Sequence, residues 1–326
     1  MRYDSTGTRT RYIDSTLSIE PMVFQLADAK NCVAFLFGSK PTSKGEPEPV
    51  GTCFFVEFSE ASGHSNLRYL VTAKHVLIDL QKLGKAVVRL NNPNGGVSYL
   101  PVPLEEGEWL LSSDEAIDVA VLPLPWVLGE ADYELAFDNL DAPLNGDPWP
   151  WPIREGEDVA FTGLVFNFLG KSKNLLALRV GTMALVPDEP IQGLYGGPSQ
   201  YYVIDVQAYP GNSGAPVWFV SGLSCFLLGV LSAGYPTKAQ LHQLATSTFR
   251  KEEYYNLGMA LVTPIEKVLA IIKPHLEREN EMNKKKVAPA PLSPPTPFTR
   301  DDMESALRKV SRKVKPSTPD QSSKRT

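Results

Sequence analysis

Short apolar runs separated by turn residues dominate the chain from about residue 21 onward. Runs of about four to eight aliphatic, β-branched and aromatic residues between Gly, Pro, Asn and Asp clusters are typical of strands. The N-terminal half has this pattern at 32–38, 51–58, 68–72, 86–90 and 119–124. The C-terminal half has it at 158–163, 175–180, 201–206, 215–220, 226–232 and 257–262. The pattern predicts two all-β units joined by a Pro- and Gly-rich connector.

A helix is predicted after the last strand. Thr263 is a suitable N-cap, Pro264 suits the first helical position, and Glu266 completes a capping box. Apolar residues then follow at helical spacing as far as Leu276, which predicts a helix that packs on the second β unit. We expect Pro274 to kink or shorten this helix. For the polar stretch 238–253, the pattern leaves a short helix and a long surface loop as alternatives.

Charge is unevenly distributed along the chain. The formal net charge is −5, and residues 281–326 carry eleven Lys/Arg and five Asp/Glu, so the rest of the chain is strongly acidic. This basic tail contains a Pro-rich linker and an amphipathic pattern at 301–315. The tail is either a solvated segment or a docking site for a partner protein. We expect no nucleic-acid binding, because the tail lacks interleaved aromatic residues and the body is acidic.

Composition limits the class of protein. A hydrophobic content of 43% is ordinary for a soluble protein, and no run of about 18 apolar residues suggests a membrane span. The polar N-terminus lacks the apolar region of a signal peptide, and the three cysteines show no CxxC pair. We therefore expect a cytoplasmic protein with buried thiols at Cys32, Cys53 and Cys225 and no cysteine-bound metal.

Ser213 lies between two glycines, in the segment Asp205–Pro216 (DVQAYPGNSGAP). Glycines allow a tight turn, and they let successive backbone N–H groups point at one place. A serine hydroxyl is a weak nucleophile that needs a base, and the base needs a group to orient it. Of the four histidines, only His75 directly follows an apolar strand. Asp118 precedes another apolar strand, where a carboxylate needs a partner. His75, Asp118 and Ser213 are therefore the candidate catalytic residues.

These motifs resemble those of trypsin-like, chymotrypsin-fold (clan PA) serine proteases. The resemblance lies in the segments Thr72–His75 (TAKH), Asp118–Leu122 (DVAVL) and Gly211–Pro216 (GNSGAP). Within that clan the chain is most similar to the bacterial HtrA-type branch, through Gly51–Val56 (GTCFFV) and Gly258–Pro264 (GMALVTP). It departs from that branch at Cys53 and Ala215, where glycine is common, and it has no PDZ module.

The resemblance implies an all-β fold of two antiparallel six-stranded β-barrels, with the active site in the cleft between them and a C-terminal helix. The expected parts are a flexible N-terminus, a first barrel with His75 and Asp118, a connector, a second barrel with Ser213, a helix and a disordered tail: 1–20, 21–125, 126–152, 153–263, 264–280 and 281–326.

The resemblance also implies serine endopeptidase chemistry through an acyl-enzyme, with an oxyanion hole formed by the backbone N–H groups of Gly211 and Ser213. It implies that neither a metal nor an organic cofactor is needed. By the same resemblance, the substrate-binding residues are Gln207, Ala208, Ser232, Ala233, Gly234, Gly258 and Ala260. Gln207 stands where an acidic residue would select Lys or Arg, so we expect a preference for small or medium apolar side chains.

Two alternatives remain open at this stage. One is a latent or inactive protease-fold adaptor that binds partners through its basic tail. The other is an esterase that uses the same three residues.

Overall fold

The computed structural model describes residues 28–38, 48–59, 66–124, 133–141, 152–195, 197–222, 224–239 and 253–287. The chain divides into two compact units, residues 1–280 and 281–326, and the architecture below is that of the first. Within the described residues the chain is mostly β, as the apolar runs predict. The predictions for 1–20, for most of the connector 126–152 and for the amphipathic segment 301–315 lie outside the described residues.

The N-terminal half forms one mixed sheet. Its strand order is β5 (Val97–Val102), β4 (Ala86–Asn91), β1 (Val33–Gly38), β2 (Glu48–Ser59), β3 (Asn66–Thr72), β7 (Ala120–Leu124) and β6 (Leu110–Leu111). These neighbours are antiparallel, and β8 (Asp138–Asn139) adds a parallel pair with β2. β8 lies in the predicted connector, so part of that segment belongs to the sheet. No strand pair among the described residues joins β5 to β6, so a closed first barrel stays a prediction.

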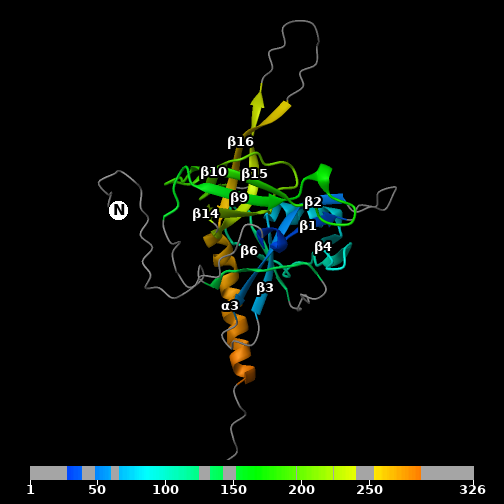
Figure 1. Cartoon of the computed structure of the whole chain (residues 1–326). Helices are drawn as coiled ribbons and strands as arrows, with labels where there is room; N and C mark the ends of the chain where they lie inside the picture. The colour runs from blue at the N-terminus through cyan, green and yellow to red at the C-terminus, as the bar shows by residue number, and fades with distance from the viewer. Residues whose placement is uncertain are drawn as a thin grey trace, which may run out of the picture. The chain divides into compact units, whose positions relative to one another are not determined.

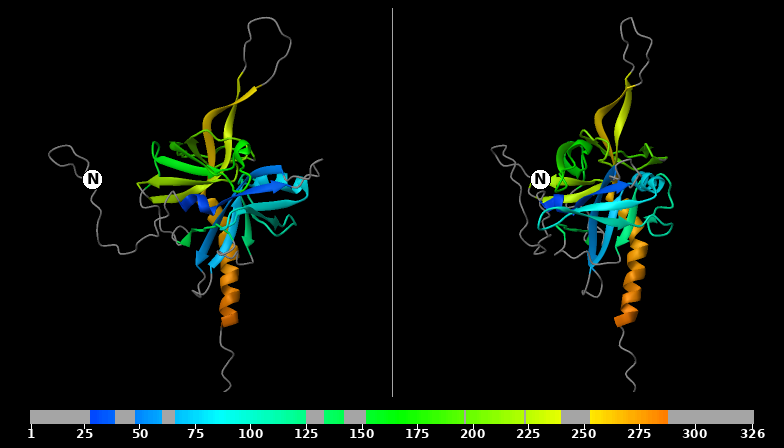
Figure 2. Two further views of the ribbon diagram at one scale, coloured as in Figure 1. Left: turned by 45° about the vertical axis from the view of Figure 1, so that its right-hand side comes forward. Right: turned by 90° about the vertical axis from the view of Figure 1, so that its right-hand side faces the viewer.

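The C-terminal half closes into a six-stranded barrel, as expected. Around the barrel the order is β10 (Ala177–Leu185), β13 (Tyr202–Asp205), β16 (Glu253–Pro264), β15 (Ser224–Ala239), β14 (Pro216–Ser221) and β9 (Asp158–Gly163). β15 and β16 extend past the barrel as a two-stranded ribbon (Figures 1 and 2), in which Ala239 pairs with Glu253. The two ends of the polar stretch 238–253 are therefore strand, rather than helix or loop.

Several short elements and two helices complete the unit. The short elements are the 3-10 turns η1 (Asp28–Cys32) and η2 (Phe166–Phe168) and the hairpin of β11 (Ile191–Gln192) and β12 (Pro198–Ser199). Helix α1 (Lys74–Leu83) was not predicted; it ends at Gly84, whose φ of 75° places it in the left-handed region favoured at helix ends. Helix α3 (Ile265–Val287) confirms the predicted terminal helix. The predicted start is wrong, because Thr263 and Pro264 are the last two residues of β16, where Thr263 shares a hydroxyl hydrogen bond with Ser232 at 2.7 Å. The helix continues past Pro274, so the expected shortening at that residue is wrong.

The first sheet buries both of its faces, because its strands alternate between two cores. On β2, Phe54 and Val56 face a core shared with the barrel strands β14 and β15 and with α3, whereas Cys53 and Phe55 face a core closed by α1. Alternation with a period of two is what places neighbouring residues on opposite faces. The shared core joins the two halves of the unit. The three cysteines are buried, as expected, and burial raises the pKa of the Cys32 and Cys53 thiols.

Candidate active site

His75 and Asp118 come together because β3 and β7 are antiparallel neighbours. Thr72 at the end of β3 pairs with Ala120 at the start of β7, so the residues just outside the two strands share one edge of the sheet. His75 lies there in the first turn of α1, and Asp118 lies just before β7. Asp118 Oδ2 is 2.8 Å from His75 Nδ1, and Asp118 Oδ1 accepts the backbone N–H of His75 at 2.9 Å. Both carboxylate oxygens therefore bind the same histidine.

Burial explains why this pair needs two contacts. The Asp118 side chain is 1% exposed and that of His75 is 13% exposed. A buried carboxylate is costly unless hydrogen bonds compensate it. Because the carboxylate accepts, Nδ1 of His75 carries the proton, and Nε2 presents a lone pair. A lone pair on a ring held in one orientation is what a general base requires.

Ser213 lies in a tight turn, Tyr209–Gly214, that leads into β14. The backbone N–H of Asn212 donates to the Tyr209 carbonyl at 3.0 Å, and the Tyr209 N–H donates to Asn212 Oδ1 at 2.7 Å. Gly211 has a φ of 95° and follows a proline, which is the pattern of a type II turn. Gly214, on the other side of Ser213, has a φ of 84°. The turn thus depends on glycine at both positions, since other residues resist this conformation.

Thr52 of β2 holds this turn from the N-terminal half. Its Oγ1 donates to the Gly211 carbonyl at 2.7 Å and accepts the Leu164 N–H at 2.9 Å. Its backbone N–H donates to the Ser213 carbonyl at 2.9 Å. Asn212 adds a bond from Nδ2 to the Leu164 carbonyl. Thr52 is fully buried, so these contacts fix the Gly211 and Ser213 carbonyl groups of the turn in a place that water does not reach.

Two backbone donors in the turn are not used within the described part of the chain. Neither the Gly211 N–H nor the Ser213 N–H donates a hydrogen bond there. Gly211 is buried, and a buried N–H without a partner is costly unless a ligand accepts its bond. The Ser213 hydroxyl donates to the Ser232 carbonyl on β15 at 3.2 Å, so its single proton is directed at β15 rather than at His75.

The predicted substrate-binding residues come from neighbouring strands of the barrel. Gly234 on β15 pairs with Ala260 on β16, and the backbone N–H of Val206, just after β13, donates to the Gly258 carbonyl at 2.6 Å. Ala208, Ser232, Ala233 and Ala260 are buried. Gln207 is exposed, and its Oε1 accepts a hydrogen bond from the Tyr209 hydroxyl at 2.7 Å. The strands thus bring β15 and β16 positions side by side, and their use as a specificity pocket stays a prediction.

Sequence reasoning missed Thr52 and Tyr195. Tyr195, in the loop between β11 and β12, stacks on His75 with ring centroids 3.8 Å apart and an angle of 11° between the ring planes. Thr52 is 159 positions from its partner Gly211, and no local pattern marks such a contact. The signal in the sequence was a polar residue, Thr52, directly after a glycine in an apolar strand, and we interpreted it only as part of that strand.

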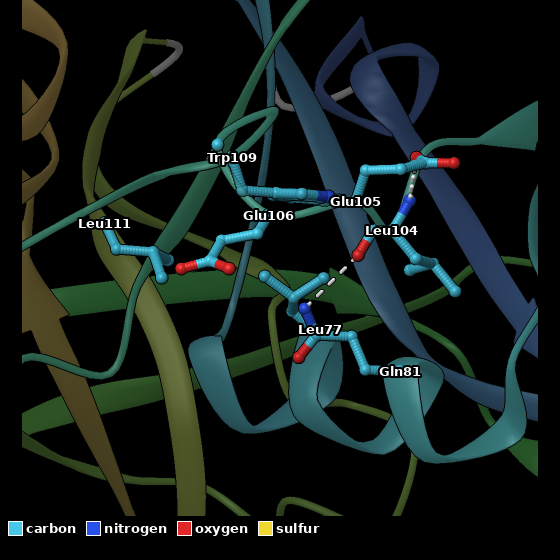
Figure 3. A pocket seen from close by; sticks show the side chains of 8 residues that line it. Leu77, Gln81, Leu104, Glu105, Glu106, Trp109 and Leu111 are labelled. Atoms are coloured by element: carbon cyan, nitrogen blue, oxygen red, sulfur yellow. Dashed lines mark hydrogen bonds between the residues drawn. The ribbon is translucent and has the colours of Figure 1, made fainter.

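A cavity of about 390 Å³ lies elsewhere on the N-terminal half. Leu77 and Gln81 of α1 line one side, and the segment from Leu104 to Trp109 lines the other (Figure 3). Gln81 Nε2 donates to the Leu104 carbonyl across it at 3.5 Å. None of the candidate catalytic residues lines this cavity.

Among the described residues, no group of three or more His, Cys, Asp or Glu side chains is arranged to hold a metal ion. In the same ranges, no helix has both the length and the apolar character to cross a bilayer.

Comparisons with known proteins give structural similarity only. No protein-family model and no curated protein match the sequence. The HtrA-type protease AlgW with a bound tripeptide is similar over 78% of this chain, with 19% identity and a TM-score of 0.45, and this chain covers 64% of its length. Deg5 is similar over 75% of this chain and 88% of its own, with 15% identity and a TM-score of 0.43. The MamO protease domain from Magnetospirillum magneticum is similar over 74% of this chain and 96% of its own, with 13% identity and a TM-score of 0.44. The first of these bears the same HtrA-type description as the branch that the sequence resembles.

Proposed function

We propose that the protein is a serine endopeptidase in which Ser213, His75 and Asp118 hydrolyse peptide bonds through an acyl-enzyme. The observation that carries the proposal is the two-point contact between a buried Asp118 and His75, which leaves Nε2 of the ring as a base. An aspartate that only caps a strand accepts hydrogen bonds from backbone donors. In Asp118 one carboxylate oxygen instead accepts a hydrogen bond from the imidazole, which is the arrangement that orients a general base.

The chemistry follows from these groups. Ser213 Oγ attacks the peptide carbonyl carbon while His75 Nε2 takes the hydroxyl proton. The resulting oxyanion accepts hydrogen bonds from the unused N–H groups of Gly211 and Ser213. The C–N bond then breaks, the leaving amine takes the proton from His75, and an ester to Ser213 remains. Water repeats the sequence with His75 as base, which releases the acid and restores the serine. Asp118 stabilises the imidazolium in both halves.

The reaction requires the Ser213 hydroxyl to turn from the Ser232 carbonyl toward His75. One rotation about χ1 changes the direction of the hydroxyl, because serine has three staggered rotamers. Substrate supplies a reason for the change, since an extended peptide paired with Ser232–Gly234 competes for the same carbonyl edge. The proposed pocket has its base near Ala208 and its walls at Ala233 and Ala260, and these small buried residues favour small or medium apolar side chains.

A latent protease-fold adaptor is the second candidate, and the direction of the Ser213 hydroxyl favours it. An adaptor has no need to bring Oγ to His75, and a resting site without that contact is what such a protein would show. An esterase uses the same residues and differs only in the leaving group that it accepts.

Hydrolysis assays separate these functions. We expect the wild type to cleave an unfolded protein substrate into fragments, and Ser213→Ala to lose this activity while keeping its melting temperature. Cleavage of p-nitrophenyl esters without any cleavage of peptides would instead identify an esterase. No turnover of either substrate class would favour the adaptor.

A further inference from the structure

Tyr195 covers one face of the His75 imidazole. The two rings are nearly parallel, with their centroids 3.8 Å apart, so the tyrosine ring lies directly over the imidazole rather than beside it. Tyr195 is 46% exposed, whereas the His75 side chain is 13% exposed. The tyrosine is thus the outer layer of this stack, between the imidazole and the solvent.

The hairpin that carries Tyr195 is fixed to the segment next to Asp118. Its strands β11 and β12 are paired, and Tyr201 just after β12 donates from its hydroxyl to the Ala116 carbonyl at 3.0 Å. Gly193, just after β11, leaves room for this tyrosine: a Cβ there would lie 2.6 Å from the Tyr201 hydroxyl oxygen. The C-terminal half therefore holds an aromatic ring in place over the histidine of the N-terminal half.

The stack of Tyr195 on His75 lies where a bound peptide would place the side chain of the residue before the cleaved one. In an extended peptide, successive side chains point to opposite sides. In the proposed function, the side chain of the cleaved residue points into the barrel, near Ala208 and Ser232. The side chain of the preceding residue then points away from the barrel, toward His75. That space above the imidazole is filled by Tyr195.

We propose that Tyr195 is a specificity-determining residue, which restricts the substrate residue immediately before the cleaved residue to small side chains. This inference rests on the proposed endopeptidase function. The ring, rather than the hydroxyl, performs the exclusion. Burial, together with the nearby Asp118 and Asp79 carboxylates, raises the pKa of the Tyr195 phenol, so the residue is a neutral aromatic plate near neutral pH.

Two matched peptide anilides test the proposal. Both have alanine as the cleaved residue, and the preceding residue is alanine in one and phenylalanine in the other. We expect the wild type and Tyr195→Phe to prefer the alanine peptide. Tyr195→Ala should raise kcat/KM for the phenylalanine peptide relative to the alanine peptide by about tenfold or more, the usual effect of opening an apolar pocket. Tyr99→Ala, at a tyrosine of similar exposure (45%), is the control and should leave the ratio unchanged.

A second readout does not depend on catalysis. Diethyl pyrocarbonate modifies accessible imidazoles, and mass spectrometry of the digested protein reports the extent at His75. Removal of a stacked ring in Tyr195→Ala should speed this modification by about two- to tenfold, as expected for the loss of an aromatic pair. Tyr195→Phe should keep the wild-type rate.

The outcomes separate the two proposals. Wild-type cleavage with the same peptide ratio in Tyr195→Ala would overturn the role of Tyr195 and leave the endopeptidase function standing. An unchanged rate of His75 modification would overturn the cover itself. Failure of every variant to cleave either peptide or the unfolded protein substrate would overturn the endopeptidase function, and the specificity role with it, even if His75 became more reactive.

Discussion

The two parts of the candidate site are held in different ways. His75 and Asp118 lie in one half of the unit, at the ends of adjacent strands, and are joined by two direct contacts. The Ser213 turn lies in the other half, and it is held by backbone carbonyls and by Thr52, which reaches it across the shared interface. The base is thus fixed by its own sheet, whereas the nucleophile depends on how the two halves fit. Changes at the two parts should therefore have different consequences.

Asp118→Asn should have the largest effect on chemistry. Asparagine keeps the size of the side chain, but its NH₂ group cannot accept a hydrogen bond from the Nδ1–H of His75. The ring therefore loses the acceptor that orients it and holds the correct tautomer. We expect kcat for peptide hydrolysis to fall on the order of 10⁴-fold. Circular dichroism melting should show a folded protein. Retention of most of the activity would mean that the His75–Asp118 pair is only structural.

Gly214→Ala should disrupt the Ser213 turn itself. A Cβ at this position would lie 2.2 Å from the Thr52 carbonyl oxygen and 2.3 Å from Thr72 Oγ1, at a φ of +84°. Because backbone cannot move aside easily, we expect a loss of more than about 3 kcal/mol in the free energy of unfolding, measured by urea titration.

Gly222→Ala is the matched control for that substitution. Gly222 also has a positive φ, of 64°, but a Cβ there meets nothing within 4 Å. It should cost only the conformational strain of about 1–2 kcal/mol. Equal losses in the two variants would show that the contact between the halves adds nothing to the strain at Gly214.

Thr52→Val should weaken the hold on the turn without breaking the fold. The change removes the hydroxyl that serves the Gly211 carbonyl and the Leu164 N–H, which leaves both buried groups without that partner. We expect about 1–3 kcal/mol of lost stability, and peptide hydrolysis slowed by about tenfold. Thr52→Ser should restore both, because it keeps the hydroxyl.

Thr162→Val provides a second comparison for the buried hydroxyl. Thr162 is equally buried, but its Oγ1 has no hydrogen-bond partner in the described part of the chain. Its loss should therefore be neutral or slightly stabilising. If Thr52→Val and Thr162→Val behave alike, Thr52 does not position the turn.

Asp138→Asn should change the pH dependence of stability and leave the chemistry untouched. Burial raises the pKa of Asp138 to about 7, and its Oδ2 accepts a bond from Trp218 Nε1 of the barrel at 3.3 Å. Because the folded protein keeps the proton to higher pH than the unfolded chain, its stabilising effect is lost as the pH rises through about 7.

The wild type should therefore lose stability between pH 5 and pH 8 by more than Asp138→Asn does, as measured by urea titration at each pH, a window that spans the raised pKa of Asp138. Peptide hydrolysis at pH 6 should be the same in both proteins. Parallel stability profiles would show that Asp138 does not titrate in this range.

Much of the sheet structure could be predicted from sequence, because apolar alternation reports which residues are buried. The strand before His75 and the strand after Asp118 were predicted for this reason. The pairing of these two strands, which brings the two residues to one edge of the sheet, was not predicted. Helix α1 was missed, although Val76, Leu77 and Leu80 are spaced for a helical face and Gly84 ends it. The run is short, and its apolar residues followed a strand without a capping side chain.

The contacts between the halves could not be predicted. Thr52, Leu164 and Tyr195 reach the candidate site through the packing of two separate sheets, and that packing has no periodic signature in the chain. Pro274 is a case in which a local signal predicted a shorter helix than the structure has. Ile272 and Leu276, on either side of it, are buried in the core that joins the halves, and this burial holds the helix together past the proline.

The most direct test of the central claim is fluorophosphonate labelling, followed by mass spectrometry of the labelled peptide. A fluorophosphonate reacts with a serine only when a neighbouring base takes its proton and donors stabilise the developing charge. We predict one adduct, on Ser213, in the wild type, and none in Ser213→Ala or His75→Ala. A folded wild-type protein that acquires no adduct at Ser213, or acquires it equally in His75→Ala, would contradict the account.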